Sequence, residues 1–120
     1  MSINRESTSI AYNLGRLFAV LEKAQKDAIP GANTTIKDRF YGSASATPSV
    51  VFPQLLRLGQ HHLQKAEYGG RLDKMIEEIM RGISEFPAHF GLDDQGMFAI
   101  GYYHQRQAFY AKPENKKEGE

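Results

Sequence analysis

The chain has 120 residues, of which 41% are hydrophobic, and its 15 basic and 14 acidic residues give a formal net charge of +1. This length holds one domain with a single hydrophobic core. The absence of cysteine excludes disulfides, thiolate zinc sites and a cysteine nucleophile, and it fits a reducing cytoplasm, where we expect the protein. A net charge this small does not favour a nucleic-acid-binding protein, which often has a larger basic excess.

Neither a signal peptide nor a membrane span is expected. The first residues, "MSINRESTSIAYNLG", are polar before they become apolar, which is not the pattern of a signal peptide. The longest apolar run, residues 17–21, is far too short to cross a bilayer.

Apolar residues recur at three- and four-residue steps, and this spacing predicts helices. The first helix begins after Ser7, Thr8 or Ser9, because a hydroxyl oxygen there accepts an otherwise unpaired backbone N–H. It ends at "IPGAN", residues 29–33, where proline and glycine favour a turn. Its apolar stripe consists of Ile10, Leu14, Leu17, Phe18, Leu21 and Ala24.

Proline and small residues divide the middle of the chain. A short second helix is predicted over about residues 34–41, and the small polar residues 42–47 are expected to form a loop. Pro48 suits the first turn of a third helix, where its missing N–H does no harm. Pro53 either kinks this helix or marks its true start, and "YGG" at 68–70 closes it.

Two more helices complete the prediction. The fourth covers about residues 71–83, and the fifth runs from a cap at Asp93 or Asp94 to about Ala111. No alternating strand pattern or hairpin signal is present. The fold class is therefore all-α, a single bundle of about four long helices and one short one, with antiparallel neighbours because the connections are short.

The bundle is expected to occupy residues 1–112. The segment 113–120 has the polar composition of a disordered tail.

Histidines and acids do not form a catalytic or metal-binding pattern. His61 and His62 are adjacent, so their side chains diverge by about 100° on a helix, whereas a helical zinc site needs two histidines on one face. The acidic pairs at 77–78 and 93–94 are explained by surface ion pairs and by the helix dipole. No phosphate-binding loop, nucleophile elbow or dinucleotide fingerprint occurs. We therefore expect a non-catalytic protein without a metal or cofactor.

A basic row runs along the third helix. Arg57, His61 and Lys65 recur at four-residue steps opposite the apolar face, with one acid, Glu67, at the margin. Such a row suits a phosphate backbone, because each Lys or Arg that meets a phosphate releases condensed counterions. The alternative is a solvated helix face. Further candidates for nucleic-acid contact are Lys37, Arg39, Arg71, Lys74 and Arg106.

The last helix is rich in aromatic residues. Aromatic side chains beside Arg106 can stack on unpaired bases, or they can belong to the core. In the second case the glycines permit close contact between helices, which would offset their cost of about 1 kcal/mol in a helix. The residues are Phe98, Tyr102, Tyr103, Phe109 and Tyr110, together with Gly96 and Gly101.

Three long strings, residues 11–28, 36–63 and 98–110, resemble the C-terminal region of the large subunit of type I-C CRISPR Cascade. The resemblance implies that the chain is the small subunit, made separately from an internal start, although an excised C-terminal domain would look the same. It also implies a helical bundle lining the belly of the complex, beside the backbone subunits, the large subunit and other copies of itself. Such subunits help to hold the DNA strands of the R-loop and are not nucleases.

This role favours the interpretation that the basic row contacts nucleic acid. The guide RNA recognises the target sequence by base pairing. A subunit that contacts the guide only indirectly therefore needs only to attract the phosphate backbone of the opened DNA. We therefore expect sequence-independent contacts from the row. The alternative is a protein–protein spacer, in which leftover aromatic surface, including Tyr41 and Tyr110, forms an interface.

Overall fold

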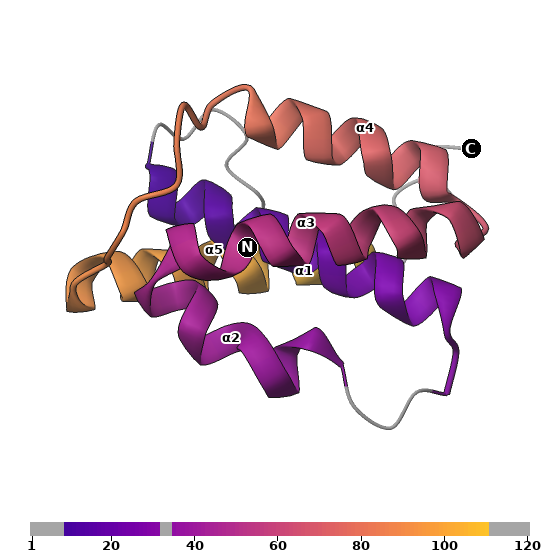
Figure 1. Ribbon diagram of the computed structural model, residues 1–120, viewed down its shortest axis with the longest axis horizontal. Helices are drawn as coiled ribbons and strands as arrows, with labels where there is room; N and C mark the ends of the chain where they lie inside the picture. The colour runs from indigo at the N-terminus through magenta and orange to yellow at the C-terminus, as the bar shows by residue number, and fades with distance from the viewer. Residues whose placement is uncertain (1–8, 32–34, 111–120) are drawn as a thin grey trace, which may run out of the picture.

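The computed structural model describes residues 9–31 and 35–110, and within these ranges it contains helices and no strand. In Figure 1, α1, α3 and α5 run from left to right, and α2 and α4 run back. Neighbours in the sequence are thus antiparallel, and the all-α prediction is confirmed. The helices are α1 (Ile10–Ala28), α2 (Ile36–Ala46), α3 (Pro48–Lys65), α4 (Gly69–Met80) and α5 (Leu92–Tyr110).

Two of the predicted features lie outside the described residues. These are the alternative caps Ser7 and Thr8, and the tail over 113–120. Ser9 is the observed cap of α1, since its hydroxyl accepts a hydrogen bond from the Tyr12 N–H at 3.1 Å.

The second helix is longer than predicted. It continues to Ala46, so the expectation of a loop over residues 42–47 is wrong. Ala44 and Ser45 are buried, because small side chains let α2 pack closely against its neighbours. The Ser45 hydroxyl donates to the Gly42 carbonyl, which satisfies it inside the helix. Tertiary packing therefore overrides the turn propensity of this segment.

Prolines and acids mark the other helix ends. Pro48 occupies the first turn of α3, as predicted, and Pro53 lies inside one continuous helix. The prediction that Asp93 or Asp94 caps α5 is wrong, because the helix begins at Leu92 and both acids lie in its first turn. Negative charge there still complements the helix dipole.

Helix α1 is the centre of the bundle. It contacts all four other helices, and every residue from Ala11 to Glu22 is buried. The predicted apolar stripe is therefore only part of its buried surface, because charged Arg16 and Glu22 are also enclosed. Arg16 donates from Nε to the Gln105 Oε1 atom of α5 at 3.0 Å. Among the described helices, none is both long and apolar enough to cross a membrane.

Two glycines bring α1 and α5 together. A Cβ atom at Gly15 would overlap the Phe98 carbonyl oxygen, and one at Gly101 would overlap the Tyr12 carbonyl oxygen. The prediction of close helix contact thus holds for Gly101. It fails for Gly96, where an added Cβ would meet open space.

An aromatic cluster fills the space beside this crossing. The ring centroid of Phe18 lies 6.0 Å from that of Phe98 and 5.8 Å from that of Tyr102. Tyr41 from α2 completes the cluster, with its ring 5.4 Å from those of both Phe98 and Tyr102. Tyr41, expected at an interface in the spacer alternative, thus packs within the bundle.

We expect opposite effects from alanine at the two α5 glycines. Gly101→Ala should lower the free energy of unfolding by about 1–3 kcal/mol, because its methyl group forces two backbones apart. Gly96→Ala should raise the free energy of unfolding by up to about 1 kcal/mol, because alanine is the better helix former. Urea unfolding followed by circular dichroism measures both. Equal effects would show that the α1–α5 contact is not close.

Candidate nucleic-acid interface

The basic row predicted on the third helix lies on the surface of α3. Arg57, His61 and Lys65 are exposed, whereas Leu55 and Gly59 on the other side of the helix are buried. The outer two bases, Arg57 and Lys65, are eight positions apart in the helix, which places their backbones about 12 Å apart along the axis. Neither forms an ion pair with another described residue, so both cations are available to an anion.

The two adjacent histidines belong to different environments. His61 is exposed, whereas His62 is only 5% exposed. Burial lowers the pKa of His62 below its ordinary value of 6.5, and the positive charges of His61 and Lys65 lower it further. His62 is therefore a neutral packing residue at pH 7. The sequence held a signal for this, because Leu55, Gly59 and His62 share the spacing of one helix face.

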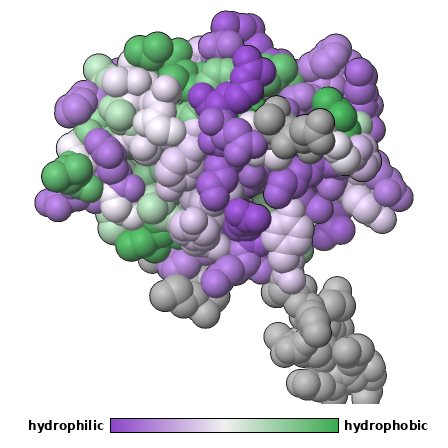
Figure 2. Space-filling model, turned by 90° about the horizontal axis from the view of Figure 1, so that it is seen from below, coloured by the Kyte–Doolittle hydropathy of each residue, from purple (hydrophilic) through white to green (hydrophobic). Residues whose placement is uncertain are grey.

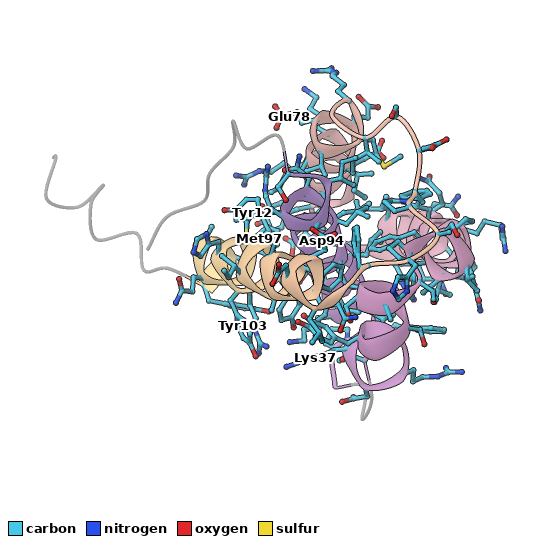
Figure 3. All side chains as sticks on the ribbon, turned by 90° about the vertical axis from the view of Figure 1, so that its left-hand side faces the viewer. Tyr12, Lys37, Glu78, Asp94, Met97 and Tyr103 are labelled. Carbon is cyan, nitrogen blue, oxygen red and sulfur yellow. The ribbon has the colours of Figure 1, made fainter. Side chains whose placement is uncertain are left out.

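The bases of α2 lie near aromatic rings. The Lys37 ammonium lies over the rings of Tyr102 and Tyr103, 5.5 and 5.8 Å from their centroids. Figure 3 shows Lys37 and Tyr103 on the same side of the bundle. Arg39 is exposed, with its guanidinium carbon 5.4 Å from the Phe40 ring centroid. Helix α5 thus holds Lys37 by cation–π attraction.

Arg106 takes part in a buried network. Its Nη1 atom donates to the Tyr102 hydroxyl at 3.2 Å, and that hydroxyl donates to the Glu22 Oε1 atom at 2.6 Å. Burial and the bond to Glu22 raise the pKa of Tyr102, which keeps its proton available for donation. Arg106 therefore helps to balance an acid enclosed in the core, in addition to any role at the surface.

The bases of α4 differ in their surroundings. Arg71 lines a groove of about 630 Å³ between the end of α1, the beginning of α4 and the end of α5. The groove exists because α4 and α5 both pack on α1 while, over the described residues, their backbones stay apart from each other. Lys74, one turn further along α4, is exposed and is not part of the groove wall.

Sequence reasoning missed two further bases of the groove. Lys23 and Lys26 line its α1 side, and their ammonium groups lie 5.4 and 5.8 Å from the centroid of the Tyr110 ring. Lys23 also pairs with Asp27 at 3.1 Å. The spacing of three residues places both lysines on one helix face, but no sequence pattern predicts that this face contacts Tyr110.

The eight candidate residues therefore occupy distinct places. Helix α3 touches α5 through its buried face, where the ring centroids of Phe52 and Phe98 lie 6.4 Å apart, whereas the basic row lies on its exposed face. Lys37 and Arg106 instead lie against Tyr102 of α5. Arg71 belongs to the groove. Across residues 9–31 and 35–110, no three His, Asp or Glu side chains gather where they could hold a metal ion.

We expect a pH dependence of stability from His62. The unfolded chain binds a proton at His62 near the ordinary pKa of 6.5, whereas the folded protein binds it only at a lower pH. Unfolding therefore takes up a proton once the pH has fallen below about 6.5. The free energy of unfolding should therefore decrease as the pH falls below about 6.5, the ordinary value, towards the lower pKa of the folded protein. His62→Gln should weaken this decrease and His61→Gln should retain it, as measured by urea unfolding. A pH profile that responds equally to both substitutions would contradict the assignment.

One comparison with known proteins identifies a family. A family model described as CRISPR-associated protein (Cas_Csd1) matches residues 1–110 of the chain. The match spans all five helices and all the candidate bases. No curated protein matches the chain.

Proposed function

Since the chain belongs to the Cas_Csd1 family of CRISPR-associated proteins, we propose that it is the non-catalytic small subunit of a type I-C Cascade complex. In this role it lines the belly of the complex, beside the backbone subunits, the large subunit and further copies of itself. It stabilises the R-loop by contacting the backbone of the opened DNA strands without reading their sequence.

The observation that carries this proposal is the row on α3. Arg57 and Lys65 are exposed and have no acidic partner among the described residues, so a phosphate can approach them without breaking an ion pair. In a guide-directed complex the RNA supplies sequence specificity by pairing. A helix face with two fixed positive charges is then sufficient for one subunit, because several copies aligned along a strand add their contacts.

A spacer role is the second candidate, and exposed apolar residues favour it. Val50 is 70% exposed and Leu92 is 85% exposed, at the beginnings of α3 and α5. Figure 2 shows separate hydrophobic patches on the left of the molecule and along its upper edge, while hydrophilic residues cover the centre of the same side. Apolar surface of this kind suits contact with another protein.

Charge reversal on α3 distinguishes the two roles. In reconstituted guide-loaded complex, Arg57→Glu with Lys65→Glu should weaken binding to every matched target alike. It should also reduce the slope of log K against log salt by about 1.4 per copy engaged, the effect of losing two contacts to a single strand. R-loop formation on a matched duplex at several salt concentrations measures both effects.

Arg81→Glu, compared with Arg57→Glu alone, provides the control, because Arg81 is exposed at the end of α4, is not a candidate contact and changes the net charge equally. The α3 variant should be much weaker than this control. If the α3 variant binds as well as wild type at every salt concentration, strand holding by α3 is wrong and the spacer role stands.

A further inference from the structure

The groove between α1, α4 and α5 combines aromatic, apolar and basic side chains. Phe109, Met75 and Tyr68 supply its apolar and aromatic surface, and Arg71, Lys23 and Lys26 supply positive charge. Two acids, Asp27 and Glu67, also line it, so the basic residues exceed the acidic ones by one. This combination suits a ligand with a flat apolar part and a negative part.

The two walls of the groove are not equally occupied. On the α1 side, Lys23 and Lys26 already lie over the Tyr110 ring, and Lys23 is paired with Asp27. On the α4 side, Tyr68 is 55% exposed, and its ring contacts neither an aromatic ring nor a cation of the described residues. Arg71 likewise has no ion pair there. A ligand would therefore find its free contacts on the α4 wall.

Backbone packing fixes the position of that wall. A Cβ atom at Gly69 would overlap the Leu63 carbonyl oxygen, so the turn between α3 and α4 is pressed against the end of α3. The Tyr68 carbonyl accepts the N–H groups of Arg71 and Leu72 at 3.1 and 3.2 Å. The ring of Tyr68 and the guanidinium of Arg71 therefore project from one hydrogen-bonded turn.

Size and shape limit the occupant. A volume of about 630 Å³ lies within the roughly 300–1,000 Å³ of sites that enclose one small organic group. An amphipathic peptide helix needs a longer groove with anchors over several turns. A nucleotide supplies a planar base for an exposed ring and a phosphate for an arginine, and base–aromatic stacking is how unpaired strands are bound without sequence preference.

We propose that this groove binds one nucleotide of an unpaired DNA strand, with the base stacked on Tyr68 and its phosphate at Arg71. The proposal rests on the proposed function for the origin of the strand, which is the DNA opened in the R-loop. Lys65 ends α3 three residues before Tyr68, so the row on α3 leads to the turn that bears the groove wall. The row attracts the backbone, and the groove selects single-stranded over paired DNA.

Nuclear magnetic resonance of the full chain tests the site directly. We expect hexathymidine to shift the backbone amide signals of residues 67–72 and 108–110. A DNA hairpin with a fully paired stem should leave them in place, because its bases are not free to stack. Hexaglutamate, the probe for an acidic peptide, should also leave them in place. Shifts confined to residues 57–65, equal shifts with the hairpin, or larger shifts with hexaglutamate would each overturn the proposal.

Matched substitutions test the two contacts. Tyr68→Ala should raise the dissociation constant for hexathymidine about five-fold or more, the effect of losing one base–aromatic stack. Tyr68→Phe should bind like wild type. Tyr103→Ala is the aromatic control, because Tyr103 is 50% exposed but lies outside the groove. Arg71→Glu should weaken binding more than Lys74→Glu on the same helix. Equal effects within either pair would contradict the assignment.

The assembled complex separates this proposal from the proposed function. Tyr68→Ala should weaken R-loop binding without changing its salt dependence, because stacking releases no counterions. If only Arg57→Glu with Lys65→Glu impairs the complex, the groove proposal is wrong and the proposed function stands. If only Tyr68→Ala impairs it, the groove binds the strand and α3 does not.

Discussion

The close crossing of α1 and α5 at Gly15 and Gly101 is the contact on which the rest of the structure depends. Because neither position bears a side chain, the two backbones touch, and the surrounding aromatic rings pack against one another beside the crossing. This contact brings Tyr102 to Glu22 and so supplies the hydrogen bond that a buried carboxylate requires. It also carries the end of α5 to Lys23 and Lys26 on α1.

The position of α1 at the centre of the bundle determines which surfaces the other helices leave exposed. The other four helices each pack on α1, so the described backbones of α4 and α5 flank it at a distance and leave a groove over its last turns. Helix α3 uses one face against α1 and leaves its basic face outward. Strand attraction and base stacking can thus occupy neighbouring surfaces of one small domain, with the turn after α3 between them.

The sequence predicted the fold class, the number of helices and the exposed row on α3, because these follow from the spacing of apolar residues along one helix at a time. It did not predict that α2 continues to Ala46, since small polar residues favour a loop until a neighbouring helix packs on them. Nor could it distinguish Gly101 from Gly96, because only the partner backbone makes one of them necessary. The groove was missed for the same reason, since Lys23, Arg71 and Phe109 come from three helices that the fold alone brings together.

Whether α3 faces DNA in the assembled complex is the central question. A photoreactive amino acid at Gln64, which is exposed on α3 between His61 and Lys65, reports what lies against this face. We expect irradiation of the complex bound to a matched duplex to join Gln64 to an opened DNA strand, and to do so only after the R-loop has formed. Crosslinks to protein subunits alone, with or without DNA, would contradict strand holding by this helix.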